Sequence, residues 1–450
     1  MKTLWSGSRR THPLTFLFTV GDDPAWDRHL LRWDVLGSLG HLEGLVASRL
    51  VTQADYRRLR SGLRAALAAA DDGRLAIRPR HEDAHSAVEE WLVARLGAAG
   101  ERIHTGRSRN DQVAVNIRLM LKDRLLDLHE AAGDLAGTLL AFAAKHRRAL
   151  WPGYTHLRRA MPSSAGLWAA ALGEGLLDTV EALDAVWRQV DRSPLGSAAG
   201  YGVPLPLKRE TAAAALGFRG VEHAIGSVQN GRGKLEAAAL FWCVQMGHEV
   251  GKLASDVVLL SGEEFGMLEL PAEFATGSSI MPHKRNPDVF ELTRGRVALI
   301  EADLAATLGI RAKLTSGYHR DWQLLKGPLI AGLARTGSLL SMMTVVVPAL
   351  RVHAKPLEGG TLSTDEVMRR VEAGVPFRQA YRDVAAALKR GERFPAPGPG
   401  ELMARRRGTG GLGNLDLGAA RRRLRAAERW RRAERARFDR AMARLAGKAR

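Results

Sequence analysis

Residues 113–147 read VAVNIRLMLKDRLLDLHEAAGDLAGTLLAFAAKHR, a stretch that is rich in Ala and Leu and contains no proline. Such a run is longer than most helices of globular proteins, which rarely exceed about 20 residues. Residues 164–192, 234–261 and 289–311 have the same character. Helices of this length predict a long bundle, and such a bundle can be shared between subunits.

The segments around these runs complete a helical pattern. Residues 27–70 carry apolar side chains at three- and four-residue steps. Pro and Gly gather between the helical runs, at 152–162, 193–206 and 271–287, and the sequence PAPGPG at 395–400 is typical of a turn or linker. Because no stretch is strand-like over enough residues to build a substantial sheet, the sequence predicts an all-α fold.

Length and composition exclude several classes of protein. At 450 residues the chain exceeds one usual core, so two or three domains are expected. No apolar run reaches the roughly 18 residues that span a bilayer, and residues 1–5 lack the apolar segment of a secretory signal. Cys243 is the only cysteine, which leaves no disulfide framework and no thiolate metal cluster. These features predict a cytoplasmic protein with no membrane partner.

The net charge of +19 is unevenly distributed. Residues 401–450 hold 16 Arg and Lys against 5 Asp and Glu, which is more than half of the excess. Apolar residues recur at helical spacing through this segment, which predicts a solvated basic helix. Nonspecific attraction to phosphates would follow from its charge, but no nucleic-acid-binding module accompanies it, so we expect no specific nucleic-acid partner.

Dense polar chemistry lies in the segments between the long helices. Residues 104–112 read HTGRSRNDQ, and the guanidinium of Arg109 with the amide of Asn110 suits capture of a carboxylate. His85 and Glu89 stand one helical turn apart, which fits either a local helix pair or part of a site. Residues 318–326, which include Tyr318, Gln323 and Lys326, can reach one side of a pocket.

Two further segments carry groups that suit acid–base chemistry. Residues 153–157, GYTHL, place His156 beside the hydroxyl of Thr155 in a loop, where a histidine is more often a surface residue than a catalyst. Residues 277–291 read GSSIMPHKRNPDVFE. Their start provides a mobile backbone with N–H donors and small hydroxyls, Lys284 could hold a carboxylate, and Glu291 could orient a base elsewhere.

Taken together, these motifs resemble the argininosuccinate lyase family of the fumarase/aspartase superfamily. The segment at 277–291 is similar to the signature loop of the superfamily, and HTGRSRNDQV at 104–113 is similar to a motif of the family. The segment 151–162, the turn PLGS at 194–197, and the residues 363–365 with 374–378 also resemble family motifs. The likeness covers roughly residues 27–425 in matching order.

The resemblance implies a three-domain, nearly all-helical subunit. The domains expected from it are an N-terminal helical domain at 1–106, a central bundle at 107–353, and a small C-terminal helical domain with a basic tail at 354–450. It also implies a homotetramer in which the central helices pool into one bundle. Each active site would then draw residues from three chains, and its partner would be a small-molecule substrate.

The activity implied by the resemblance is β-elimination from an N-substituted aspartate, which releases fumarate and an amine or guanidine such as arginine. Ser278 matches the family's base, and Lys284 and Asn286 would hold the carboxylate that accumulates charge. His156 matches the second catalytic residue, and Glu291 would pair with it. No metal or organic cofactor is required. The matched or candidate substrate contacts are His85, Arg109, Asn110, Thr155, Tyr318, Gln323 and Lys326.

The sequence departs from the family pattern in two places. At residues 21–24, GDDP, a substrate-contacting serine of the family is replaced by Asp23. At residues 227–235 the family's Asp is replaced by Gln229, and its Arg and final Asp by Lys234 and Leu235. An exchange of Arg for Lys at a bidentate site is not conservative. Both places concern the amino-acid half of the substrate and leave the elimination residues intact.

Three hypotheses remain open at this point. The chain is an argininosuccinate lyase that completes arginine biosynthesis, or a sister lyase that acts on another N-substituted aspartate in specialised metabolism. The departures from the family pattern favour the sister lyase. The third hypothesis is a non-catalytic scaffold, which would have no need for Ser278, His156, Lys284 and Glu291 together.

Overall fold

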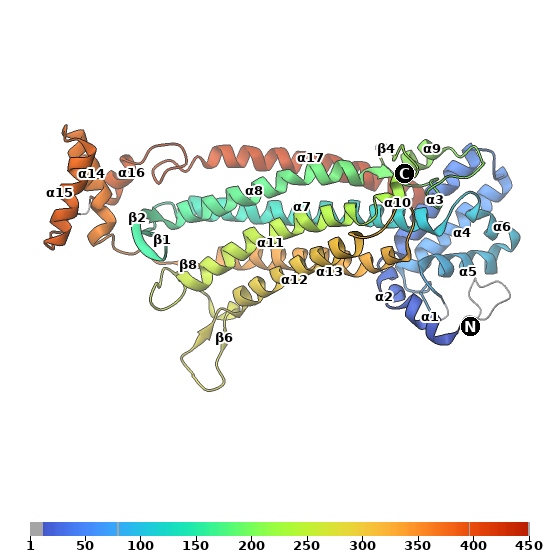
Figure 1. Ribbon diagram of the computed structural model, residues 1–450, viewed down its shortest axis with the longest axis horizontal. Helices are drawn as coiled ribbons and strands as arrows, with labels where there is room; N and C mark the ends of the chain where they lie inside the picture. The colour runs from blue at the N-terminus through green and yellow to red at the C-terminus, as the bar shows by residue number, and fades with distance from the viewer. Residues whose placement is uncertain (1–11, 79–80, 396, 449–450) are drawn as a thin grey trace.

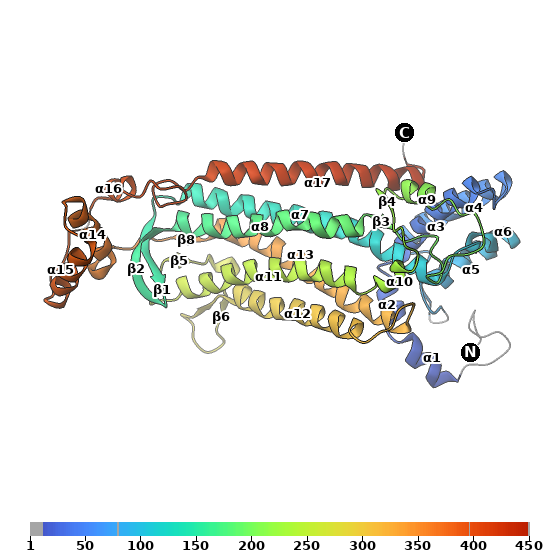
Figure 2. The same ribbon diagram turned by 45° about the horizontal axis from the view of Figure 1, so that its top comes forward.

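Five long helices run side by side and form the body of the molecule in the computed structural model, which describes residues 12–78, 81–395 and 397–448 (Figures 1 and 2). The expected all-α class is confirmed, and each of the four long runs predicted from the sequence is a single helix. The bundle helices are α7 (Arg109–Lys145), α8 (Ala165–Val190), α11 (Lys234–Leu260), α12 (Asp288–Arg311) and α13 (Lys326–Val346).

Smaller helical groups lie at the two ends of the bundle (Figure 1). One end carries α1 (Pro13–Val20), α2 (Asp23–Asp27), α3 (Leu31–Ala47), α4 (Gln53–Asp71), α5 (Ala84–Leu96), α6 (Ala98–Glu101), α9 (Arg209–Ala215) and α10 (Ser227–Asn230). The other end carries α14 (Ser363–Glu372), α15 (Phe377–Lys389) and α16 (Pro399–Ala404). Short 3-10 turns are η1 (Arg102–His104), η2 (Ala272–Phe274), η3 (Arg320–Leu325), η4 (Val347–Ala349) and η5 (Gly359–Leu362).

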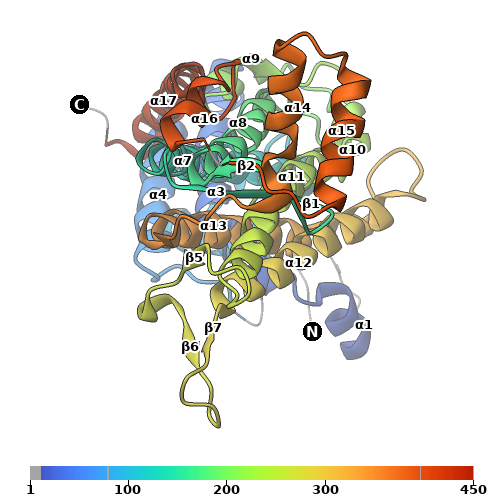
Figure 3. The same ribbon diagram turned by 90° about the vertical axis from the view of Figure 1, so that its left-hand side faces the viewer.

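The strands of the described residues form four isolated pairs, as expected for a chain without a substantial sheet. Three pairs are antiparallel: β1 (Leu150–Thr155) with β2 (Arg158–Ser164), β5 (Leu268–Glu269) with β8 (Arg351–Val352), and β6 (Thr276–Gly277) with β7 (Arg285–Asn286). The fourth pair, β3 (Arg192–Ser193) with β4 (Gly220–Val221), is parallel. The β6–β7 hairpin projects away from the bundle (Figure 3).

The start of α7 is held by its own polar side chains. Ser108 is the N-cap residue, and its backbone N–H donates to Asp111 Oδ1 at 2.9 Å, which completes a capping box. The other oxygen of Asp111 accepts from the backbone N–H groups of Gly196 and Ala198 at 2.9 and 3.0 Å. Burial raises the pKa of Asp111 to about 6. The polar motif at 104–112 is therefore partly structural, because it starts the helix and ties down the turn at 194–198.

The basic C-terminal segment is a helix, as expected, but it is solvated on one face only. Helix α17 (Leu417–Ala446) lies along α7 and α8 for its whole length (Figure 2). Its arginines meet carboxylates of these helices: Arg423 with Glu181 at 2.9 Å, and Arg435 with Asp123 at 2.7 Å. Much of the local positive charge is therefore neutralised within the chain, which the sequence periodicity could not show.

Phe438 anchors this helix over a buried lysine. The Phe438 side chain is 1% exposed, and the Nζ of Lys122 on α7 lies 5.4 Å from its ring centroid. Lys122 pairs with Asp191 and donates to the carbonyl of Gly217 at 2.6 Å. Burial lowers the pKa of Lys122 to about 8, although Asp191 opposes the shift. A charged group this deep is tolerated because it is paired and covered by aromatic rings.

The predicted domain boundaries at 106/107 and 353/354 stay a prediction. The first falls between η1 and α7, and the second falls just after β8. Helix α17, however, packs along the bundle rather than with α14, α15 and α16. The C-terminal segment thus has two parts with different surroundings.

One stretch of the described chain, Arg320–Ala349, is long and apolar enough to cross a membrane by composition, with a mean hydropathy of 1.5. Half of the most apolar 18-residue segment of this stretch is buried inside the fold. A core helix of a bundle meets the same criterion, so this single stretch is weak evidence for a membrane span.

The packing of α17 predicts that Phe438→Ala lowers the free energy of unfolding by about 3–5 kcal/mol, because it leaves a cavity over Lys122. Urea unfolding at fixed protein concentration, followed by circular dichroism, measures this loss. Arg440→Ala on the exposed side of the same helix is the matched control, with an expected change within about 0.5 kcal/mol. Equal stability of the two variants would contradict an anchoring role for Phe438.

Candidate active site

Most of the predicted substrate-contacting residues gather at one end of the bundle. Arg109 and Asn110 open α7, whereas Tyr318, Gln323 and Lys326 come from the segment that leads into α13. All five line one cavity of about 10 Å³, together with Asp23, Val113, Arg232 and Trp322. A volume of this size holds about one water molecule. The structure therefore brings these residues together in one small pocket.

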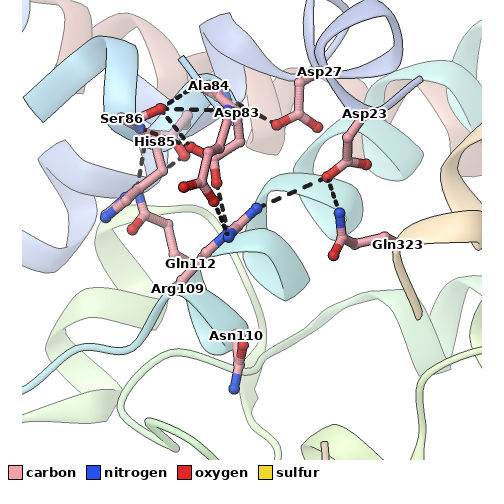
Figure 4. Close-up of polar contacts among 12 residues, drawn as sticks. Asp23, Asp27, Asp83, Ala84, His85, Ser86, Arg109, Asn110, Gln112 and Gln323 are labelled. Carbon is pink, nitrogen blue, oxygen red and sulfur yellow. Dashed lines mark hydrogen bonds and ion pairs between the residues drawn. The ribbon is translucent and has the colours of Figure 1, made fainter. Parts of the chain in front are cut away.

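Carboxylates surround the Arg109 guanidinium (Figure 4). Its Nε lies 2.5 Å from Asp83 Oδ2, and its Nη1 lies 3.6 Å from Glu82 Oε2. The same Asp83 is the N-cap of α5 and accepts from the backbone N–H of Ser86 at 2.8 Å. Helix α5 and helix α7 thus fix the guanidinium between them. The remaining carboxylate near Arg109, that of Asp23, is 3.9 Å from its Nη2.

A buried lysine joins α13 to α2. The Lys326 side chain is 2% exposed, and its Nζ lies 2.9 Å from Asp23 Oδ1 and 2.5 Å from Asp27 Oδ1. Asp27 Oδ2 accepts from the backbone N–H of Ala84 at 2.9 Å, and Gln323 Nε2 donates to Asp23 Oδ2 at 2.7 Å. Burial acts to lower the pKa of Lys326, but the two carboxylates outweigh it and the pKa is raised.

His85 lies beside Arg109 in a cluster of buried side chains (Figure 4). Its Nε2 is 3.9 Å from Glu89 Oε2, as the local helix pair predicts, and its ring centroid is 4.3 Å from that of His104. It also has a hydrogen bond with Gln112, and burial holds the pKa of His85 well below its usual value. His85 therefore belongs to the same end of the molecule as the pocket.

The ligand atoms of His85, Glu89 and His104 lie within 4.8 Å of one another, which is the spacing of a metal site. Arg107 Nη2 lies 3.3 Å from His104 Nδ1, and a guanidinium can only donate, so Nδ1 is the acceptor. The His104 proton is then on Nε2, which faces Glu89 Oε2 at 3.4 Å. A protonated nitrogen beside a buried guanidinium does not suit a cation, so the cluster fits a metal poorly.

The predicted base lies in the β6–β7 loop. Ser278 Oγ accepts from the backbone N–H groups of Ile280 and Met281 at 3.3 and 3.1 Å. Asn286 Nδ2 donates to the carbonyl of Gly277 at 3.4 Å and closes the base of the loop. Lys284 and Glu291 are exposed and form no ion pair within the described part of the chain. The loop has the N–H donors that its composition predicted.

His156 occupies a strained turn. It and Leu157 form the two-residue turn between β1 and β2, where Thr155 pairs with Arg158. Their φ angles are +53° and +57°, a region that non-glycine residues rarely adopt. Two positive φ values are typical of a type I′ turn, which normally takes Asn and Gly. Thr155, His156 and Leu157 are all exposed at the tip.

A single chain does not bring His156 and the β6–β7 loop close to the Arg109 pocket. Arg109 is the first residue of α7 and β1 begins shortly after its last residue, so the hairpin of His156 and the Arg109 pocket are separated by the length of α7. Its 37 residues span about 55 Å at the rise of an α-helix. The β6–β7 loop lies at the hairpin end of the bundle (Figure 1). The predicted pairing of His156 with Glu291 is not formed among the described residues.

Sequence reasoning missed Arg232, which lines the pocket, and Asp27, which contacts the lining residue Lys326. Asp27 follows Asp23 by one helical turn, and that i, i+4 spacing of two acids was the available signal. Arg232 lines the cavity and its Nε pairs with Glu236 Oε1 at 3.0 Å, whereas Lys234 lies exposed at the start of α11. Gln229 is buried and lies outside the pocket lining. The segment 227–235 thus still sends a guanidinium to the pocket, from a different position.

Comparison with known proteins agrees with these motifs. Residues 43–300 match the family described as Lyase. The argininosuccinate lyase of Sorangium cellulosum is 40% identical over 94% of this chain and 98% of its own length. That of Parabacteroides distasonis is 38% identical over 87% of this chain and 89% of its own.

Solved structures share the fold. An EDDS lyase variant with bound fumarate superposes with a TM-score of 0.80 at 24% identity and covers 98% of this chain and 96% of its own. A class II fumarase from Schistosoma mansoni gives 0.72 at 13% identity, over 87% of this chain and 90% of that one. At these identities the likeness shows the fold alone. The sequence matches go further, and the chain belongs to the argininosuccinate lyase family of carbon–nitrogen lyases.

Proposed function

We propose that the protein cleaves an N-substituted aspartate by β-elimination and releases fumarate and an amine or guanidine. Argininosuccinate is the first candidate substrate, because relatives that cover most of the chain carry the name argininosuccinate lyase. The observation that carries the proposal is the Ser278 loop, whose hydroxyl oxygen accepts two backbone N–H groups. Those donors favour a partial negative charge on Oγ, which a serine base requires.

In this proposal Ser278 removes the proton from the carbon next to a carboxylate. The carbon acid is weak, so the charge that accumulates on that carboxylate must be stabilised, and Lys284 and Asn286 are the groups of the same hairpin that can do so. His156 is the second catalytic group, and Glu291 would orient it where the assembly of chains brings the two residues together. The strained turn supports this role, because strain of this kind gathers at functional sites. No metal or organic cofactor enters any step.

We propose that the active chain is a cytoplasmic homotetramer with shared sites. Leu292 and Leu299 lie two turns apart on one side of α12 and are 60% and 49% exposed, and Phe241 of the neighbouring helix α11 is 56% exposed. Apolar side chains of this size along one bundle typically mark a protein–protein interface. A second chain packed antiparallel on this face would bring the β1–β2 turn and the β6–β7 loop of one chain close to the Arg109 pocket of the other.

A second candidate function is a sister lyase for another N-substituted aspartate. The observation that favours it is Asp23, whose carboxylate already contacts Lys326 and Gln323 in the pocket. Fumarate release from argininosuccinate, adenylosuccinate and aspartate, measured in parallel, distinguishes the two candidates. Fumarate release from argininosuccinate alone supports the first candidate, an argininosuccinate lyase. If a folded tetramer releases no fumarate from any of the three compounds, the protein either cleaves another N-substituted aspartate or is a non-catalytic scaffold.

The base assignment predicts that Ser278→Ala lowers the rate of fumarate release at least about a hundredfold, because general-base catalysis contributes at least that much. Steady-state kinetics on purified protein measure the loss, and light scattering checks that the mass of the assembly is unchanged. Ser279→Ala, one residue along the same loop, is the matched control and keeps most of the activity. Retention of activity in Ser278→Ala would disprove the base assignment.

The shared-site proposal predicts that two inactive variants restore each other. Ser278→Ala removes the base at the hairpin end, and Asn110→Leu obstructs the pocket at the other end. Hybrids formed by mixing equal amounts of the denatured chains and refolding them should regain about a quarter of wild-type activity, because random mixing leaves that fraction of sites intact. Each variant refolded alone is the control. No recovery in verified hybrids would mean that each site comes from one chain.

A further inference from the structure

A carboxylate of the protein itself fills the pocket that the substrate would enter. Asp23 is 4% exposed, and its two oxygens contact Lys326 Nζ at 2.9 Å and Gln323 Nε2 at 2.7 Å. Its Oδ2 is also 3.9 Å from Arg109 Nη2. These three partners are the cationic and amide groups of the pocket that suit a carboxylate of the substrate. Asp23 therefore stands where such a carboxylate would have to bind.

Helix α2 holds Asp23 firmly in this place. Asp27, one turn further along the helix, binds the same lysine, so two carboxylates join α2 to α13. Trp26 lies between them in sequence and packs on Gly327, where a side chain of any size would meet the indole at 3.1 Å. Arg320 Nη2 donates to the carbonyl of Thr19 just before α2 at 2.9 Å. Moving α2 away from the pocket would require breaking all of these contacts.

The charges of the pocket oppose a second anion. The two cations Arg109 and Lys326 are already contacted by four carboxylates, Asp23, Asp27, Glu82 and Asp83, and of these four only Asp23 lines the pocket. The guanidinium of Arg232 does not change this balance, because it is paired with Glu236. A substrate carboxylate placed here would face the carboxylate of Asp23 and would find no unpaired cation, which disfavours binding, whereas a cation would be attracted to Asp23.

We infer that Asp23 determines the specificity of the elimination by selecting a leaving amine that carries a cation, and no carboxylate, at the end that enters this pocket. The substrate class is an N-substituted aspartate derived from a diamine or a guanidinoalkyl amine. The inference rests on the proposed function, because it concerns which N-substituted aspartate is cleaved, and it favours the second candidate function, the sister lyase, over an argininosuccinate lyase. It assigns no role to Asp23 in the elimination step itself.

Two substrates that differ by one carboxylate test this inference. They are argininosuccinate and its counterpart built on agmatine, the amine that results from decarboxylation of arginine. We expect the wild-type kcat/KM for fumarate release to favour the agmatine compound at least about tenfold, a ratio that corresponds to about 1.4 kcal/mol. Asp23→Ser and Asp23→Asn should each raise kcat/KM for argininosuccinate at least about tenfold, mainly through KM, and lower it for the agmatine compound.

Asp22→Ser is the matched control, since it removes the same charge from the neighbouring, exposed residue, whose side chain does not cap α2. It should leave the preference unchanged. Thermal unfolding of each variant verifies that the fold is kept, and Asp23→Asn preserves the shape of the side chain if Asp23→Ser does not fold. An unchanged preference in a folded Asp23 variant would overturn the inference and leave the proposed function in place.

A measurement of leaving-group binding alone tests the role of Asp23 separately from the elimination reaction. Calorimetry with agmatine and with arginine requires no turnover, so it reports on the pocket even if neither compound yields fumarate. Tighter binding of agmatine by the wild type, reversed in Asp23→Asn, supports the role of Asp23. Tighter binding of arginine by the wild type would overturn that role. Fumarate release from neither compound, with the expected binding, would count against the elimination and not against Asp23.

Discussion

The uninterrupted burial of α7 is the constraint on which the rest of the structure depends. This single helix of 37 residues is packed by α8, α13 and α17 over its length, so it can neither bend nor shorten without exposing apolar side chains. Its two ends therefore stay about 55 Å apart. The Arg109 pocket is at one end and the His156 hairpin is at the other, and a second chain is the natural way to bring such ends together.

Charge pairing is the second feature that shapes the structure, and it differs between the surface of the bundle and the Arg109 pocket. Along the bundle, arginines of α17 meet carboxylates of α7 and α8, so a segment with a strongly basic sequence is largely neutralised where it packs. At the Arg109 pocket, the two cations Arg109 and Lys326 are contacted by four carboxylates, of which Asp23 lines the pocket itself. Buried charges are costly unless paired, so these contacts stabilise the two cations and leave neither of them unpaired for a ligand.

The sequence predicted the bundle well and the pocket in part. Residues 164–192 and 234–261 were expected to be helical, and the helices are Ala165–Val190 and Lys234–Leu260, because long apolar periodicity without proline admits little else. Arg109, Gln323 and Lys326 were expected at one pocket and lie there. Asp27 and Arg232 were missed, because each contributes through a partner far away in sequence. The packing of α17 was missed for the same reason.

The sequence by itself determined which segments are helical, which loops carry the reactive hydroxyl and the imidazole, and where the family pattern is broken, since all of these depend on local composition and order. Only the tertiary structure decided that Asp23 contacts Lys326 and Gln323, and that Ser278 and Arg109 lie at opposite ends of one chain. Both facts depend on how rigid helices pack against each other. Packing joins residues hundreds of positions apart, and no local pattern records that.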